Sequence, residues 1–173
     1  MTPTRPHAVR PPLPEWAAPD DFTAIADLNL RAYAEFCDRL PEGGWELMRK
    51  NLCNIEERSA AARFLVHRNA GGIVASAAYC PAGKGDPALF ARDMASIQLL
   101  AVHPEHRGRG LAKALTMACI SAAERDHAQF VGLFTSELMA SAQQLYRSLG
   151  FQLESELPRR HGLRFFRYVL TLN

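Results

Sequence analysis

The chain has 173 residues, of which 48% are hydrophobic and 22% charged, and its formal net charge is +2. This composition is typical of a globular protein and excludes a fibrous or wholly disordered chain, while so small a net charge does not indicate a polyanionic partner. No apolar stretch is long enough to span a bilayer, and the prolines before Trp16 interrupt any signal-peptide core. We therefore expect a cytoplasmic protein with no membrane partner, whose four scattered cysteines are buried free thiols.

Residues 1–18 are expected to form an extended arm. Proline is frequent in this segment and lacks the N–H that a strand ladder needs, so only a short edge strand near residues 8–10 is expected there. Residues 19–173 are expected to form one domain, because this length is enough for one sizeable core and short for two.

Two amphipathic helices and a hairpin come first within that domain. Apolar residues recur at helical spacing over 19–36, and after a turn containing proline and glycine they do so again over 45–55. Residues 63–66 and 73–79 are rich in strand formers, and the sequence NAGG between them predicts a hairpin turn.

The second half of the chain alternates strands and helices. A helix pattern over 107–126 opens with glycines and carries a stripe of small apolar residues, which allows close packing against a sheet. The next helix ends at Gly150 and Phe151, as expected for a left-handed cap with its apolar contact. Strands are expected over 95–102, 130–135, 152–157 and 163–171. This alternation predicts the α/β (α+β) class with a mixed sheet.

Residues 107–112 have the features of a helix start that binds phosphate. The first turn of a helix presents unpaired N–H groups and the positive end of the helix dipole, and both suit a diphosphate. Gly108 and Gly110 let the backbone approach phosphate oxygens, and Arg107 and Arg109 add positive charge. The pattern R-x-x-G-x-A alone also fits an ordinary surface turn.

The whole run VHPEHRGRGLA resembles the coenzyme A signature of the GNAT family of N-acetyltransferases. In that signature a strand ending V-x-P leads to [QR]-x-x-G-x-[GA], and the matching residues are Val102, Pro104, Arg107, Gly110 and Ala112. A second family hallmark, a helix ending L-Y-x-x-x-G-F, is matched by residues 145–151. Both motifs occur in the family's order, and the resemblance is sharp from about residue 95 to residue 151.

The resemblance implies a mixed, mostly antiparallel twisted sheet with a central splayed pair of parallel strands, flanked by helices. By position the splayed strands are 95–102 and 130–135, and acyl-CoA lies between them. The implied enzyme is an N-acetyltransferase in which the primary amine of a small molecule or peptide attacks the thioester directly. Acetyl-CoA is then the co-substrate, and no metal is expected.

The resemblance also implies which residues contact acetyl-CoA. Backbone groups of Leu100, Ala101 and Val102 pair with the pantetheine arm, and the Leu100 N–H polarises the thioester carbonyl. The diphosphate accepts N–H bonds from the turn that follows. The residues of this turn are Arg107, Gly108, Arg109, Gly110, Leu111, Ala112 and Lys113.

Tyr146, in the second motif, corresponds to the family's general acid, which protonates or hydrogen-bonds the departing thiolate. A helix tyrosine packed only for its area is the other interpretation. Met139 stands where relatives often carry asparagine, and Ser96 stands where many carry a glutamate base. These departures leave the base unassigned and a non-catalytic acyl-CoA sensor or scaffold as an alternative. The nearby titratable residues, which fit strand ends or caps more simply, are Asp93, His103 and Glu137.

The acceptor amine is not identified by any motif. The resemblance places it between the first two helices and the loop joining the last two strands, where acidic groups can attract an amine, although a solvated charged helix face fits equally well. The residues contributed there are Tyr33, Glu35, Asp38, Trp45, Arg160 and His161.

The basic and aromatic segment RRHGLRFFRY raises a different class of function, that of a nucleic-acid-binding module. Its alternation suits a final β-strand better, so no nucleic-acid partner is expected. No pattern encodes the oligomeric state, and a homodimer stays an option because dimers are frequent among similar proteins.

Overall fold

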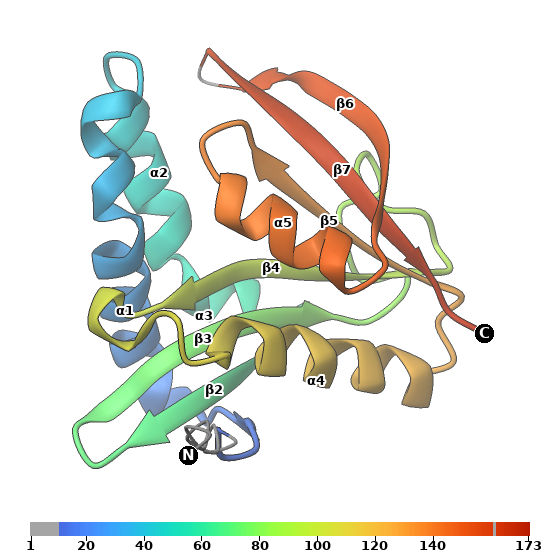
Figure 1. Cartoon of the computed structure of the whole chain (residues 1–173), viewed down its shortest axis with the longest axis horizontal. Coiled ribbons are helices and arrows are strands. Elements are labelled where there is room, and N and C mark those ends of the chain that lie inside the picture. Colours follow the sequence, from blue (N-terminus) through green and yellow to red (C-terminus); the bar gives the residue numbers. More distant parts are fainter. Residues whose placement is uncertain (1–10, 161) are drawn as a thin grey trace, which may run out of the picture.

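A seven-stranded sheet in the order β1-β2-β3-β4-β5-β7-β6 forms the centre of the computed structural model, which describes residues 11–160 and 162–173 (Figure 1). The strands are β1 (Glu15–Trp16), β2 (Arg63–Asn69), β3 (Gly72–Cys80), β4 (Met94–Val102), β5 (Phe130–Ser136), β6 (Gln152–Arg160) and β7 (Leu163–Thr171). Neighbouring strands in these ranges run antiparallel except β4 and β5, which are parallel. The expected mixed sheet with one central parallel pair is confirmed.

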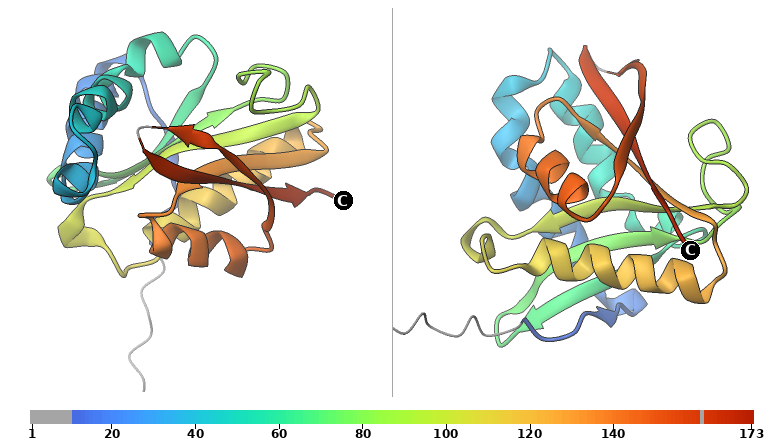
Figure 2. Two further views of the ribbon diagram at one scale, coloured as in Figure 1. Left: turned by 90° about the horizontal axis from the view of Figure 1, so that it is seen from above. Right: turned by 45° about the vertical axis from the view of Figure 1, so that its right-hand side comes forward.

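Helices cover both faces of this sheet (Figure 2). α1 and α3 pack on one face, with α2 beside α1, and α4 and α5 pack on the other. The helices are α1 (Phe22–Tyr33), α2 (Gly44–Cys53), α3 (Ile55–Arg58), α4 (Leu111–Arg125) and α5 (Ala140–Ser148), and the 3-10 turns are Pro19–Asp21, Ala34–Arg39 and Pro104–His106. The expected flanking of the sheet by helices is therefore confirmed.

The strands of the hairpin are buried on both faces. Successive side chains of a strand point to opposite faces, and here Leu65 and Ala77 contact the α4 side while Phe64 and Ala78 contact the α1 side. All four are at most 4% exposed. Burial on both faces explains why the central residues of the two strands are mostly apolar instead of alternating with polar residues, and His67 and Ser76 are buried polar exceptions.

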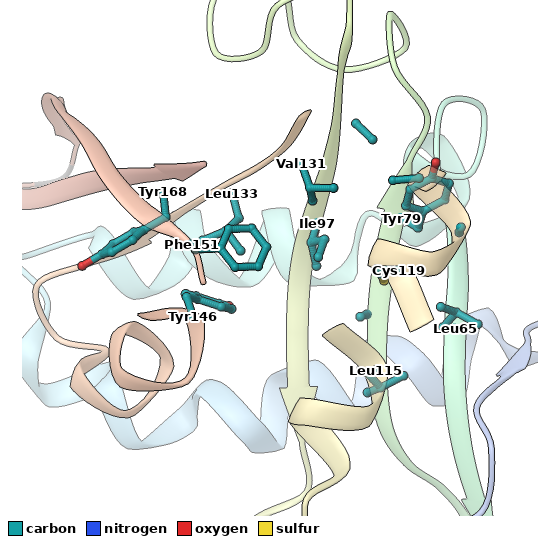
Figure 3. Close-up of a cluster of buried hydrophobic side chains, with 14 of the residues drawn as sticks. Leu65, Tyr79, Ile97, Leu115, Cys119, Val131, Leu133, Tyr146, Phe151 and Tyr168 are labelled. Carbon is teal, nitrogen blue, oxygen red and sulfur yellow. The ribbon is translucent and has the colours of Figure 1, made fainter. Parts of the chain in front are cut away.

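Packing of α4 against the sheet fixes where its first turn lies. Leu115 and Cys119 of this helix are fully buried and lie near Leu65 and Tyr79 of the hairpin strands (Figure 3). Alanines fill much of the remaining contact, so the helix can approach the strands closely. The N-terminal end of α4 is thereby held next to the end of β4.

The parallel pair β4 and β5 separates after a short paired stretch. Residues 94–96 pair with residues 130–132, and the described part of β4 beyond residue 96 has no partner in β5. β5 stays paired with β7 as far as Ser136, and β4 stays paired with β3 as far as Val102. The splayed central pair is confirmed. β4 and β5 separate, while β4 stays paired with β3 and β5 stays paired with β7.

A β-bulge marks β4 where it has left β5. Leu99 has a φ of 50°, and the register with β3 shifts between Ser76 and Ala78, so β4 carries one extra residue there. A positive φ costs a non-glycine residue on the order of 1–3 kcal/mol. The surrounding sheet must therefore stabilise this conformation.

Several sequence predictions differ from the structure in detail. The helix expected over 45–55 is two helices. Asn54 has a ψ of 56°, which interrupts the helix, and its side chain donates a hydrogen bond to Glu57 in the next helix. The strand expected near residues 8–10 lies outside the described residues, and β1 is found at Glu15–Trp16. Cys80 and Cys119 are buried as expected, but Cys37 is half-buried and Cys53 is exposed, so the predicted burial of these two is wrong.

No helix in the described ranges combines the length and apolar character that crossing a membrane requires.

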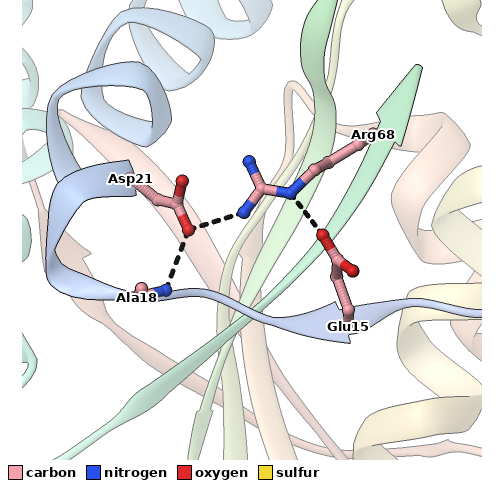
Figure 4. A network of polar contacts seen from close by, with 4 residues as sticks. All are labelled: Glu15, Ala18, Asp21 and Arg68. Carbon is pink, nitrogen blue, oxygen red and sulfur yellow. Dashed lines mark hydrogen bonds and ion pairs between the residues drawn. The ribbon is translucent and has the colours of Figure 1, made fainter. Parts of the chain in front are cut away.

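Arg68 of β2 ties the segment around β1 to the sheet (Figure 4). Its guanidinium contacts the carboxylates of Glu15 and Asp21, and the Asp21 carboxylate also accepts a hydrogen bond from the Ala18 N–H at 2.8 Å. The hydrogen bond from Arg68 lowers the pKa of Asp21. This network anchors the chain just before α1.

We expect Leu115→Ala to lower the free energy of unfolding by about 2–5 kcal/mol, because it leaves a cavity between α4 and the sheet. Met117→Ala on the same helix is the matched control, since Met117 is 51% exposed, and its effect should stay within about 0.5 kcal/mol. Denaturant unfolding of both variants measures the difference. Equal losses would contradict the assigned position of α4.

Candidate active site

The first turn of α4 carries uncapped backbone amides. Gly110 is the N-cap residue, with a φ of 77° and no side-chain cap bond, and no acidic residue stands in the first turn. The N–H groups of Leu111, Ala112 and Lys113 have no acceptor within the helix. Together with the positive end of the helix dipole, they form a local site for an anion.

The two glycines of this turn are required by backbone conformation. Gly108 and Gly110 have φ values of 74° and 77°, which only glycine adopts at little cost. A Cβ at either position would meet nothing within 4 Å in the chain itself. Space above the turn is therefore open to a ligand.

The two arginines of the turn make contacts within the protein. The Arg107 guanidinium pairs with Glu35 at 2.7 Å and donates to the Ala32 carbonyl at 2.9 Å, which ties the turn to the end of α1. Arg109 donates to the Glu105 carbonyl at 3.2 Å. The predicted charge is thus present, but part of the charge of Arg107 is balanced by Glu35.

A cleft of about 710 Å³ opens between the end of α1, the end of β4, the first turn of α4 and the start of α5. We call it the β4–α4 cleft. Every predicted cofactor residue lines it except Arg109. The structure therefore brings the two predicted groups, residues 100–102 and residues 107–113, together around one cavity.

A second cleft, of about 640 Å³, lies on the other side of the opening between β4 and β5. We call it the α2–α3 cleft, because α2 and α3 form one wall and the ends of β5 and β6 contribute to the other. Tyr33 and Met139 line both clefts. Leu99 lines the α2–α3 cleft and Leu100 lines the β4–α4 cleft, so the bulge separates the two.

Two tyrosines lie near this junction: Tyr33 is half-buried and lines both clefts, whereas Tyr146 is buried and lines neither. Tyr33 donates a hydrogen bond to the Leu100 carbonyl at 3.1 Å, and burial raises its pKa to about 12. Tyr146 extends from α5 toward the sheet, is 6% exposed and packs against Phe151 and Tyr168 (Figure 3). Burial, followed by the nearby Tyr33, raises the pKa of Tyr146 above its usual value. Both hydroxyls are protonated at neutral pH.

The family's position for a base holds a hydroxyl in this chain. Ser96 is buried, and its Oγ accepts a hydrogen bond from Gln98 Nε2 at 3.1 Å. His103 and Glu137 bind backbone N–H groups at 3.3 Å and 2.9 Å, as expected for cap residues. None of Ser96, Asp93, His103 and Glu137 lines either cleft.

The residues expected at the acceptor are divided between the clefts. Tyr33 lines both, Glu35 lines the β4–α4 cleft, and Arg160 lines the α2–α3 cleft. Asp38 and Trp45 line neither, and His161 lies outside the described residues.

Three polar residues of the α2–α3 cleft were missed by the sequence analysis. Arg58 donates hydrogen bonds to Gln98 Oε1 at 2.5 Å and to Asn51 Oδ1 at 2.6 Å. The signal that could have found them is weak: a lone arginine at the end of a short helix and a glutamine in an apolar strand. For metals, the described ranges hold no group of three histidine, cysteine or acidic side chains suited to an ion.

Comparison with known proteins identifies a family with the same features. The model of the acetyltransferase (GNAT) domain matches residues 60–153. Among solved structures, yncA from Salmonella typhimurium, determined with its cofactor acetyl-CoA, is 23% identical over 92% of this chain and 93% of that chain, with a TM-score of 0.69. No curated protein sequence matches the chain.

Two further solved structures share the fold. The ribosomal-protein-alanine N-acetyltransferase of Brucella melitensis is 21% identical over 92% of this chain and 99% of that chain, with a TM-score of 0.68. An N-acetyltransferase from Staphylococcus aureus Mu50 is 16% identical over 93% of this chain and 98% of that chain, with a TM-score of 0.69. Since the family model spans more than half of the sequence and agrees with the splayed strands and the amide-rich turn, the chain belongs to the GNAT family of acetyltransferases.

Proposed function

We propose that this enzyme transfers the acetyl group of acetyl-CoA to the primary amine of a small molecule or peptide by direct attack of the amine. The observation that carries the proposal is the β4–α4 cleft, in which uncapped amides of α4 and the unpaired edge of β4 line one cavity. An acetyl-CoA-bound relative with the same fold supports the choice of donor.

The chain's own groups suit each part of such a donor. The N–H groups at 111–113 bind the diphosphate, and Lys113 adds positive charge beside them. The edge of β4 at 100–102 has no partner in β5, so an extended amide-containing arm can pair with it as an added strand would. The carbonyls of Leu100 and Val102 accept side-chain hydrogen bonds from Tyr33 and Arg107, and each keeps a second lone pair for the arm. When bound, acetyl-CoA supplies an activated acetyl group as a thioester.

Two groups assist transfer in this proposal. The Leu100 N–H, next to the bulge, donates to the thioester carbonyl and stabilises the oxyanion that develops as the amine attacks. Tyr146, whose hydroxyl is protonated at neutral pH as an ordinary tyrosine is, gives a proton or a hydrogen bond to the departing thiolate. The amine loses its proton to water or arrives neutral, since no carboxylate occupies the usual position on β4.

The activity is tested by a coenzyme-release assay with acetyl-CoA over a panel of primary amines and short peptides, with mass spectrometry of the products. Calorimetric binding of acetyl-CoA is measured alongside. Release with an acetylated amine supports the proposal, and tight binding without transfer to any acceptor would favour the non-catalytic acyl-CoA sensor.

We expect Gly110→Val to weaken acetyl-CoA binding by about 10-fold or more, because a branched side chain covers the amides that bind the diphosphate. Gly43→Val is the matched control. Gly43 is also an N-cap glycine with a positive φ, of 74°, and no neighbour within 4 Å of a Cβ, but it lines neither cleft. Both variants carry the same backbone strain, so equal affinities in the two folded proteins would remove the assigned role of the turn.

We expect Tyr146→Phe to lower kcat by about 100-fold while leaving the Kd for acetyl-CoA nearly unchanged, because the hydroxyl acts only on the leaving group. Tyr168→Phe is the control, since it removes another buried hydroxyl of the same aromatic cluster, and this hydroxyl accepts a hydrogen bond from Arg147 and donates one to Gln143. Steady-state kinetics and acetyl-CoA titration are compared. Full turnover in Tyr146→Phe would exclude the acid role.

A further inference from the structure

The α2–α3 cleft contains a cation that forms no ion pair with a carboxylate of the described residues, although Glu57 lines the same cleft. Arg58 is held by two neutral oxygens, Gln98 Oε1 and Asn51 Oδ1, and no carboxylate lies within 4 Å of it in the ranges that the structure describes. Its Nε is buried and has no hydrogen-bond partner. Partly buried charges are normally paired, so this arginine lacks the partner its environment favours.

Other arginines of the chain show the contrast. Arg68, Arg107, Arg164 and Arg167 each contact at least one carboxylate. Arg109, Arg147 and Arg160 have no carboxylate partner within the described residues, but they are exposed, and water solvates their charge. Arg58, by comparison, has its pKa lowered by burial. Keeping this guanidinium charged in the cleft costs desolvation free energy. Such a cost is expected where a bound ligand supplies the opposite charge.

The neutral partners of Arg58 fix its position without consuming its charge. Gln98 is itself held, because its Nε2 donates to Ser96 Oγ at 3.1 Å. A guanidinium has five N–H donors, and two are used here, so donors on the Nη atoms are available for a carboxylate. The arginine is thus held in position before a ligand binds, with one N–H on each Nη atom unused.

The rest of the α2–α3 cleft suits an acid with an apolar body. Its charged lining residues are Glu57, Arg58, Lys84, Asp86 and Arg160, an excess of one positive charge. Apolar side chains, among them Met48, Phe90, Phe134 and Phe165, make up much of the remaining wall. Thr135 and Ser136 also line the cleft, but their hydroxyl oxygens are buried and have no hydrogen-bond partner among the described residues.

We infer that the acceptor is an amino acid or a similar amine that carries its own carboxylate, and that Arg58 binds this carboxylate. The inference rests on the proposed function, because it assigns the acceptor of the same reaction. Gln98 lies two residues before Leu100 on β4, and two residues span about 7 Å along a strand. The carboxylate can therefore bind in the α2–α3 cleft while the amine faces the opening shared by the two clefts.

The test compares matched acceptors with saturating acetyl-CoA and the full chain. The panel contains the common amino acids, β-alanine and 4-aminobutyrate, together with the carboxamide and the decarboxylated amine of each α-amino acid, and dipeptide amides with the same first residue. We expect kcat/KM for the best amino acid to exceed that for its amide and its decarboxylated amine by about 10-fold or more.

Arg58→Gln should raise KM for that amino acid by about 10- to 100-fold and remove its advantage over the amide. Arg58→Lys should restore part of the advantage. Both variants should bind acetyl-CoA as the wild type does, because Arg58 does not line the β4–α4 cleft. Arg49→Gln is the control, since Arg49 pairs with Glu46 on the surface of α2 and lines neither cleft.

The outcomes separate this inference from the proposed function. Failure of the wild-type chain to bind acetyl-CoA contradicts the proposed function. Binding of acetyl-CoA with equal or better transfer to amides, simple amines or dipeptide amides contradicts the role of Arg58 and leaves the acetyltransferase function standing. An unchanged preference for the amino acid in Arg58→Gln, or transfer to no member of the panel, also overturns the inference.

Discussion

The site depends on one constraint of the sheet, which is that β4 and β5 cannot remain paired along their whole length. β4 stays paired with β3 on both sides of the bulge at Leu99, and β5 stays paired with β7 to its end. The two parallel strands therefore diverge after residue 96. Backbone groups on the inner edge of each strand then need other partners. The opening is therefore a place where the chain itself requires solvent or a ligand.

The elements around this opening bring different polar groups to its two sides. α4 contributes backbone amides, and their position follows from burial of Leu115 and Cys119 under the sheet. α3 contributes Arg58, whose position follows from Gln98 on β4. Both sides therefore depend on β4. This one strand sets the distance between the backbone amides of α4 and the guanidinium of Arg58.

The sequence predicted the parts of the fold that rest on local pattern. Apolar spacing identified the strands and the long helix, and the positive φ required at Gly108 and Gly110 left a readable signature in RGRGLA. The cap at Gly150 was predicted for the same reason, and its φ is 91°.

Tertiary interactions account for what could not be predicted. Leu99 takes a left-handed conformation although it is not glycine, so the sequence contains no residue that predicts the bulge. Arg107 was expected to face a phosphate, but its pairing with Glu35 joins residues far apart in sequence. The sequence could not identify Arg58 as a site residue, because its contact with Gln98 joins residues far apart in the chain. The break at Asn54 reflects competition between a side chain and the helix backbone.

Tyr33 and Met139 line both clefts, and the other lining residues belong to one cleft alone. A molecule in one cleft therefore leaves most of the lining of the other uncovered. If the donor and the acceptor bind in the two clefts as proposed, they can reside on the protein at the same time, and neither has to depart before its counterpart arrives. Such an architecture suits a ternary complex, with kinetics that are sequential instead of ping-pong.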